Sequence, residues 1–137
     1  MKPFWRILYN HHADVILSGH AHRYERYSLL TPGGIKDSQD GIRQFVVGTG
    51  GYSGGGEIHY GQAPGLQVVK LSTPGVLKLS LGAGTYHWKF VPVAGKTFTD
   101  SAPTSVTRRA QGGPGPLCEH FSFSALQQVN YWSLLIC

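Results

Sequence analysis

The feature that most constrains the fold of this chain is an alternating pattern between residues 75 and 93. The segments GVLKLSL (75–81) and TYHWKFVPV (85–93) alternate apolar with polar residues, and GAG separates them. Alternation with a period of two places the apolar side chains on one face of a strand. A short glycine-containing turn between two such segments joins antiparallel neighbours. Together with the preceding LQVVKLS (66–72), the pattern predicts an antiparallel β-meander with one buried face.

The first part of the chain predicts a helix followed by strands. Residues 3–12 (PFWRILYNHH) begin with a proline that suits the first helical position, and one helical face would carry Phe4, Ile7, Leu8 and His11. Residues 14–19 (DVILSG) predict a short buried strand, and residues 42–51 (IRQFVVGTGG) predict a second strand that ends in glycines. We therefore expect an α+β or layered α/β fold with mostly antiparallel strands.

Turn-forming residues and a change of composition divide the rest of the chain. Residues 31–41 and 51–65 are rich in glycine and other turn formers and predict surface loops. Beyond residue 101 the sequence has no clear period, opens with a linker rich in Pro, Gly and Ser, and closes on the apolar YWSLLIC. We expect one folded unit over residues 1–101 and an unstructured or foreign tail over residues 102–137.

The composition argues against two classes of partner. The 137 residues include 12 Lys and Arg against 7 Asp and Glu, a formal charge of +5, but the basic residues are scattered. A nucleic-acid surface needs them clustered on one face, so we expect no nucleic-acid partner. The apolar runs fall far short of the ~20 residues that cross a bilayer, so we expect no membrane partner. The oligomeric state and the compartment are not readable from the sequence.

The candidate chemistry of the chain centres on LSGHAHRYER, residues 17–26. His20 and His22 alternate just after an apolar strand and Gly19, so both imidazoles can point into one pocket at the carboxyl end of that strand. Neutral imidazole is a good ligand for Zn, Fe, Mn or Ni. Two histidines do not complete a catalytic metal site, which needs three protein ligands for zinc and usually a bridging carboxylate for two metals. On spacing alone, an ordinary surface or partly buried role stays open.

The residues that follow the two histidines are candidates for supporting roles. Glu25 could orient an imidazole ring without touching a metal, and so could a backbone carbonyl. Arg26 could hold an anion or pair with Glu25. A simple local salt bridge between Glu25 and Arg26 is an equal alternative.

The order of these segments resembles the calcineurin-like metallophosphoesterases, most of all their purple acid phosphatase-like branch. That branch carries Gly-His-x-His followed by Tyr-Glu-Arg after a Val/Ile/Leu strand, as ADVILSGHAHRYER does here. FWRILYNHHADVILSGH, GIRQFVVGTGG and GVLKLSLGAGTYHWKFVPVAGKTFTDS resemble the segments around that motif. The resemblance covers roughly residues 3 to 101. It implies the C-terminal half of a metallophosphoesterase β-sandwich with a flanking helix.

The resemblance also implies a function. His20 and His22 would be metal ligands, one to each of two ions of the Fe, Zn or Mn class. The supporting or anion-binding residues would be Tyr24, Glu25 and Arg26. The family hydrolyses phosphate esters with a metal-bound hydroxide, and its ions lower the pKa of the water and offset phosphoryl charge. Arg23 stands where a different, often uncharged residue is expected, so its role is open. The parent enzyme could be secreted or extracytoplasmic.

The family's earlier metal motifs are Asp-x-His, Gly-Asp-x-x-Asp/Tyr and Gly-Asn-His-Asp/Glu, and they do not occur in this sequence. YNHHAD imitates the last of them, but Asn10 lacks the preceding glycine and lies on the predicted helix. We expect those motifs before position 1. The chain would then be a C-terminal segment that is inactive alone.

Two other classes of protein remain in view. A cupin-type metal module also places His-x-His before a Glu on β-strands, but here only two residues separate His22 from Glu25. A non-enzymatic β-rich binding module could bind sugars through Tyr60, Tyr86 and Trp88. Aromatic residues that alternate in a strand are more often part of a core.

The remaining histidines are read as ordinary solvated residues. Two are expected on the helix, one near the mouth of the site, one on an outward strand position and one in the tail: His11, His12, His59, His87 and His120.

Overall fold

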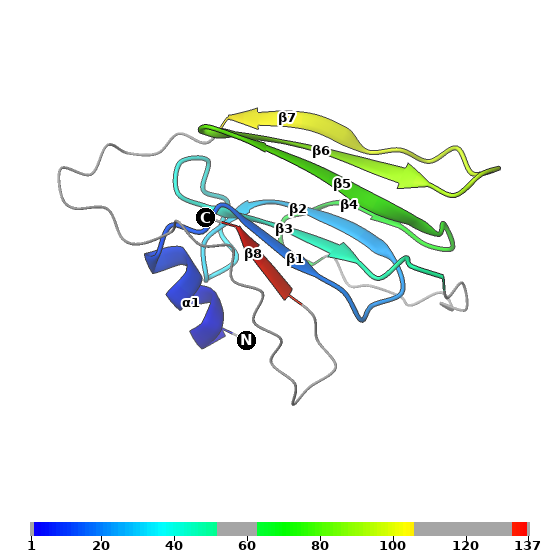
Figure 1. The fold of residues 1–137 in the computed structure, drawn as a ribbon. Helices are drawn as coiled ribbons and strands as arrows, with labels where there is room; N and C mark the ends of the chain where they lie inside the picture. Colours follow the sequence, from blue (N-terminus) through cyan, green and yellow to red (C-terminus); the bar gives the residue numbers. More distant parts are fainter. Residues whose placement is uncertain (1, 52–62, 106–132, 137) are drawn as a thin grey trace.

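The structure is a computed structural model that describes residues 2–51, 63–105 and 133–136. Within these ranges the chain is a mixed α+β fold, rich in strands, with two sheets and one short helix (Figure 1). The elements in chain order are α1 (Lys2–Asn10), β1 (Val15–Ser18), β2 (Tyr24–Leu30), β3 (Ile42–Val47), β4 (Leu66–Lys70), β5 (Gly75–Gly82), β6 (Thr85–Pro92), β7 (Ser101–Ser105) and β8 (Ser133–Ile136). The expected α+β class with mostly antiparallel strands is confirmed.

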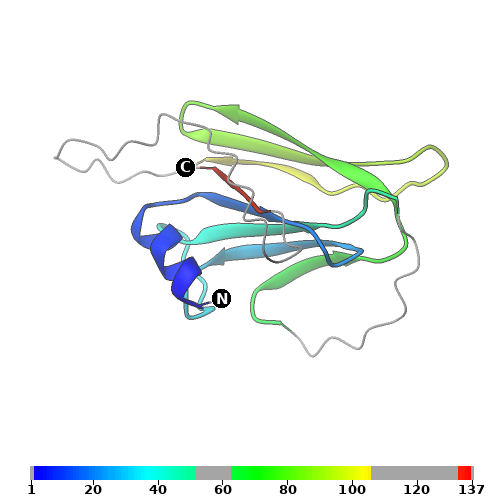
Figure 2. The same cartoon turned by 60° about the horizontal axis from the view of Figure 1, so that its bottom comes forward.

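The two sheets lie over one another as layers (Figure 2). The larger sheet has the strand order β4-β2-β3-β1-β8, and the smaller sheet has the order β5-β6-β7. In the described part of the chain β1 and β3 are the one parallel pair, and the other pairs are antiparallel. The helix α1 lies on the face of the larger sheet that is turned away from the smaller sheet (Figure 1).

The predicted three-stranded meander is wrong for its first strand. β4 does not pair with β5. It pairs antiparallel with β2, an earlier strand of the chain, and so belongs to the larger sheet. Residues 71–74 then carry the chain to the smaller sheet. Thr49 holds this crossing through two hydrogen bonds with Gly75. The Thr49 hydroxyl donates to the Gly75 carbonyl at 2.7 Å, and the Thr49 carbonyl accepts from the Gly75 N–H at 3.1 Å. The β5–β6 hairpin is confirmed, with Gly84 at a φ of 68° in its turn.

The main core fills the space between the two sheets. Strand alternation brings one set of buried side chains together there: Val15, Tyr24, Phe45, Tyr86, Trp88 and Phe90. The rings of Tyr24 and Phe90 are 4.7 Å apart, so the two layers meet through aromatic contact. A smaller cluster joins α1 to the other face of the larger sheet and consists of Leu8, Ala13, Ile16 and Ile42. Strand β1 is therefore buried on both faces, as its apolar run predicts.

The helix is shorter than predicted and packs through a different face. It ends at Asn10, and His12, at a φ of 55°, occupies the left-handed position that terminates many helices. The N–H of Ala13 bonds to the Leu8 carbonyl, and the N–H of His12 bonds to the Tyr9 carbonyl, as in a Schellman motif. The prediction that His11 and His12 lie on the helix is therefore wrong.

The predicted apolar face of the helix, with Phe4 and Ile7, is also wrong. Phe4 is 47% exposed and Ile7 is 57% exposed. Leu8 is buried instead, and Trp5 and Tyr9 pack beside it against the larger sheet. Both faces have apolar residues at helical spacing, so contact with the sheet selects between them.

Two further findings concern strands that the sequence did not predict. Strand β2 follows the histidine pair directly, and its buried residues are Tyr24, Glu25, Ser28 and Leu30. They do not alternate strictly, because the register with both neighbouring strands shifts after Arg26. Strands β7 and β8 lie at or beyond the expected boundary at residue 101, β7 beside β6 and β8 beside β1. Most of residues 102–137 lies outside the described residues, and its nature as a tail stays a prediction.

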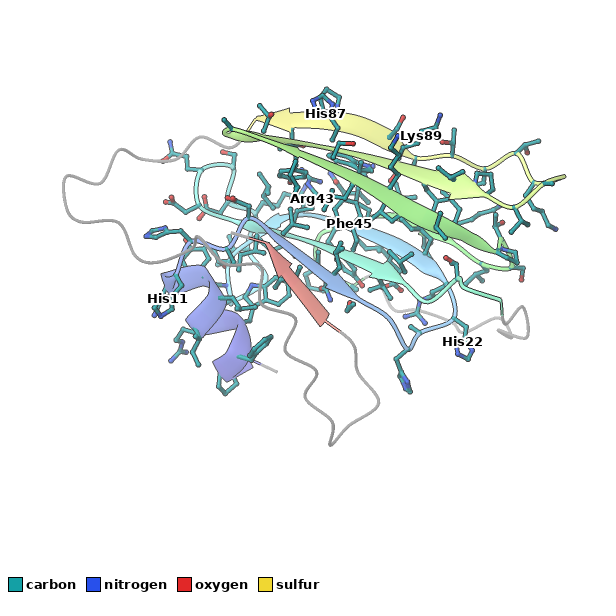
Figure 3. All side chains as sticks on the ribbon, viewed as in Figure 1. His11, His22, Arg43, Phe45, His87 and Lys89 are labelled. Atoms are coloured by element: carbon teal, nitrogen blue, oxygen red, sulfur yellow. The ribbon has the colours of Figure 1, made fainter. Side chains whose placement is uncertain are left out.

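The outer surface of the smaller sheet carries basic residues beside two exposed valines, Val76 and Val91. His87 points away from the larger sheet, while Arg43 and Phe45 lie between the layers (Figure 3). Lys78 is paired directly with Lys89 across β5 and β6, and both are exposed. Like charges opposite one another weaken a strand pair, so these lysines oppose the stability of the hairpin that carries them.

Candidate functional site

The histidine pair lies where two parallel strands end. Strands β1 and β3 run side by side in the same direction, so the segments that follow them meet at one edge of the larger sheet. Residues 19–23 connect β1 to β2 at this edge, and both His20 and His22 are exposed there. His22 lies at the tip of this connection in Figure 3. The predicted location, at the carboxyl end of a buried strand, is confirmed.

Each histidine is the central residue of a very tight turn. The N–H of Ala21 bonds to the Gly19 carbonyl at 2.9 Å, and the N–H of Arg23 bonds to the Ala21 carbonyl at 2.7 Å. Hydrogen bonds between residues two apart define γ-turns. His20 has a φ of 69°, which belongs to the rarer and more strained form of this turn. Backbone strain of this kind is concentrated at functional sites in proteins.

The glycine-rich turn after β3 supports the histidine loop from beside it. The N–H of Gly48 donates to the Arg23 carbonyl at 3.1 Å. A Cβ atom at Gly48 would lie 1.9 Å from the Ala21 carbonyl oxygen, so only glycine allows the two backbones to come this close. Gly48, the first of the glycines that end the predicted strand over residues 42–51, thus has a packing role at the site.

One face of the start of β2 carries a buried carboxylate. Glu25 is 2% exposed and accepts hydrogen bonds from the Arg23 Nε and from the Tyr27 hydroxyl, the latter at 2.8 Å. Burial raises the pKa of Tyr27, and the hydrogen bond to Glu25 raises it further. These contacts link Arg23, the last residue of the histidine loop, to the body of the strand.

The opposite face of β2 is held by Asp100. The Asp100 carboxylate accepts hydrogen bonds from the Tyr24 hydroxyl at 2.6 Å, from Arg26 Nε at 2.7 Å and from Arg26 Nη2 at 3.2 Å. Burial acts to raise the pKa of Asp100, but the hydrogen bonds from Arg26 and Tyr24 outweigh it, so this pKa lies below its usual value. Burial raises the pKa of Tyr24, and its bond to Asp100 adds to the rise.

The alternative interpretation, a local salt bridge between Glu25 and Arg26, is not what the structure shows. Adjacent residues of a strand point to opposite faces, so Glu25 meets Arg23 while Arg26 meets Asp100. Sequence reasoning did not assign roles to Arg23 and Asp100. Arg23 lies two residues from Glu25, a spacing that shares one strand face and could have indicated the pair. Asp100 is 74 positions from Arg26 and gives no local signal.

The donor set of the described residues is incomplete for a metal. No group of three or more His, Cys, Asp or Glu side chains that could hold an ion occurs in residues 2–51, 63–105 and 133–136. The imidazoles of His20 and His22 have the right chemistry but supply fewer than the three ligands that a catalytic zinc ion takes. Further ligands would have to come from outside the described residues.

The other histidines do not join this loop in the described structure. His11 lies beside α1, away from the tip of the histidine loop, and His87 lies on the outer side of the smaller sheet (Figure 3). His59 and His120 lie outside the described residues.

Two of the three aromatic residues of the alternative sugar-binding interpretation lie in the described structure. Tyr86 is 3% exposed and Trp88 is 5% exposed, so both belong to the core between the sheets. They offer no platform on which a sugar could stack. Tyr60 lies outside the described residues.

Among the residues described, no helix is both long and apolar enough to span a membrane. The chain matched no protein-family model, no curated protein and no solved structure.

Proposed function

We propose that this chain contributes the histidine loop of a two-metal phosphoesterase, an enzyme that hydrolyses phosphate esters. The observation that carries the proposal is the position of His20 and His22. Both are exposed central residues of tight turns in one loop, at the carboxyl ends of the parallel strands β1 and β3. Ligands and catalytic groups of layered α/β sheets gather at such ends. The Gly-His-x-His and Tyr-Glu-Arg sequence at this position resembles that of the metallophosphoesterases and supports the choice of a two-metal phosphoesterase.

In this proposal His20 would hold one metal ion and His22 the other, each through an imidazole nitrogen. The ions would lower the pKa of a bound water and offset charge on the phosphoryl oxygens. The remaining ligands, including the carboxylates that two-metal sites use, come from residues other than those described. The backbone of the loop, held by Gly48, limits how far the Cα atoms of the two histidines can move apart.

Arg23 suits the same function. It ends the histidine loop, and its ion pair with the buried Glu25 fixes the position of its guanidinium. A fixed guanidinium beside the site favours an anionic substrate such as a phosphate ester. This arrangement gives Glu25 the role of positioning Arg23.

The proposal is tested on the protein encoded by the complete reading frame around this chain. Hydrolysis of p-nitrophenyl phosphate and bound metal per protein are measured with Mn, Zn and Fe for the parent, His20→Ala and His22→Ala. His87→Ala is the matched control, because His87 is exposed on the outer side of the smaller sheet.

We expect each loop variant to lose metal and to lose more activity than the about 10–100-fold typical of residues that only support a ligand. His87→Ala should retain both. A His22→Ala protein that keeps its metal and its turnover would contradict the proposal. A mononuclear electron paramagnetic resonance signal from the chain alone would favour a cupin-type site instead.

A further inference from the structure

Two arginines converge on one neutral, solvent-exposed acceptor on β4. Arg26 Nη1 and Arg43 Nη1 both donate to Gln67 Oε1, the latter at 3.3 Å. Both guanidinium groups also lie over the ring of Trp88, at 5.3 and 5.0 Å from its centroid. The three polar side chains come from the neighbouring strands β4, β2 and β3, and the ring comes from β6 in the facing sheet. We call Arg26, Arg43, Gln67 and Trp88 the arginine cradle.

The charges of this cradle do not balance. The Asp100 carboxylate accepts hydrogen bonds from Arg26 and from the Tyr24 hydroxyl, so its negative charge is paired with Arg26. Arg43 donates to the Tyr86 hydroxyl and to the Tyr27 carbonyl, both at 3.0 Å, and to Gln67, so all its acceptors in the described part of the chain are neutral. The cradle therefore holds two guanidinium charges against one carboxylate. A partly buried cation without a counter-charge is a binding opportunity for an anion.

Gln67 occupies the place where such an anion would bind. Its carbonyl oxygen is the shared acceptor, and its hydrogen bonds with Arg26 and Arg43 are exposed to solvent. Gln67 lies on β4, an edge strand of the larger sheet, so its side chain can turn outward without disturbing a neighbouring strand. An anionic oxygen in place of the amide oxygen would make stronger, charge-assisted bonds with the same two donors.

We propose that the arginine cradle is a binding site for a phosphate group and that Gln67 is the stand-in for one of its oxygens. A planar carboxylate is already satisfied by a single guanidinium fork, as Asp100 is by Arg26. Two guanidiniums from different strands supply separate sets of donors around one acceptor, which suits the several oxygens of a tetrahedral oxyanion better. The site is separate from the histidine loop, and the proposal does not depend on the proposed phosphoesterase function.

The test follows the arginine Nε–H signals of the 137-residue chain by nuclear magnetic resonance during titration with inorganic phosphate. Ionic strength is held constant with sodium chloride, and acetate is titrated in parallel. We expect the Arg43 and Arg26 signals to shift and saturate with phosphate, and acetate to produce no saturable shift. Saturation by acetate but not by phosphate would overturn the phosphate assignment.

Variants of Gln67 test the cradle without removing an arginine from the core. Gln67→Glu places a carboxylate on both guanidiniums and should weaken phosphate binding at least tenfold. Gln67→Ala removes the competing acceptor and should tighten binding. Gln39→Glu, a matched amide-to-carboxylate change at an exposed loop residue, should leave the dissociation constant unchanged. Unaltered phosphate binding in Gln67→Glu, or weaker binding in Gln67→Ala, would overturn the proposal.

Discussion

The hydroxyl of Tyr24 donates a 2.6 Å hydrogen bond to the carboxylate of Asp100, 76 positions further along the chain. Tyr24 is the first residue of β2 and follows the histidine loop directly, while Asp100 immediately precedes β7 in the other sheet. The same carboxylate forms an ion pair with Arg26. The contact therefore joins the exit of the histidine loop to the smaller sheet.

Replacing Asp100 with Asn should destabilise the fold by about 2 kcal/mol, because a partly buried Arg26 loses its charge partner. The free energy of unfolding from urea titration measures the effect. Asp40→Asn is the matched control, since Asp40 lies in the 31–41 loop outside this network, and it should change stability by less than about 0.5 kcal/mol. Equal effects of the two changes would show that the Tyr24–Arg26–Asp100 network contributes nothing.

The same carboxylate sets part of the acid stability. The pKa of Asp100 is below its ordinary value of 3.8 in the folded protein, so the unfolded chain binds a proton more readily. Stability from this group is complete above the ordinary value and is lost as the pH falls through the lower folded pKa. Urea titrations at a series of acidic pH values should show a smaller difference between the parent and Asp100→Asn as the pH falls. A difference that is constant with pH would contradict this linkage.

Tyr24 makes the stability of the fold depend on pH in the alkaline range, where its contribution is lost as the pH rises. Its pKa in the folded protein is above the ordinary 10.0, chiefly through burial, so the unfolded chain loses the phenolic proton first. The stability from Tyr24 is therefore complete below pH 10 and falls as the pH rises towards the folded pKa. Tyr24→Phe should cost about 1 kcal/mol at neutral pH, and that cost should shrink above pH 10. Denaturant titrations of both proteins from neutral to alkaline pH measure the change.

Gly48 should tolerate no side chain. Gly48→Ala would place a Cβ 1.9 Å from the Ala21 carbonyl oxygen, a backbone atom that cannot move alone, so we expect a loss of about 3 kcal/mol. Gly50→Ala is the matched control, because a Cβ at Gly50 meets nothing within 4 Å. Thermal and urea unfolding of the two variants compare the positions. A Gly48→Ala protein as stable as Gly50→Ala would refute the close approach of the two backbones.

The buried Glu25 should be harder to replace than its tyrosine partner. Glu25→Gln removes the charge that Arg23 pairs with, and we expect a loss of about 3 kcal/mol. Tyr27→Phe removes one hydrogen bond to the same carboxylate and should cost about 1 kcal/mol. Urea titration of both variants gives the comparison. A smaller loss for Glu25→Gln than for Tyr27→Phe would show that the ion pair is unimportant.

The sequence predicts where the strands lie better than it predicts which strands pair with one another. The alternation in residues 75–93 locates the β5–β6 hairpin, because side-chain period and turn chemistry act locally. The pairing of β4 with β2 depends instead on which edge is free once the chain has collapsed. The helix face is ambiguous for a similar reason, since Phe4 and Trp5 both begin apolar stripes and contact with Ile16 and Ile42 decides between them.

The candidate site shows the same division. The location of His20 and His22 follows from the apolar run and glycine that precede them. The tight turns, the partner of Glu25 and the role of Asp100 depend on backbone geometry and on contacts between distant segments. Pairing of Arg26 with Asp100 across 74 positions leaves no trace in a local pattern.

The facing lysines on the smaller sheet affect how copies of the protein behave in solution. A flat strand surface is a natural place for a second copy to stack, but stacking two of these surfaces would bring four ammonium groups from Lys78 and Lys89 together. Their repulsion reaches ~10 Å at 0.1 M salt and only ~3 Å at 1 M. We therefore expect Lys78 and Lys89 to oppose the stacking of two copies more strongly at 0.1 M salt than at 1 M salt.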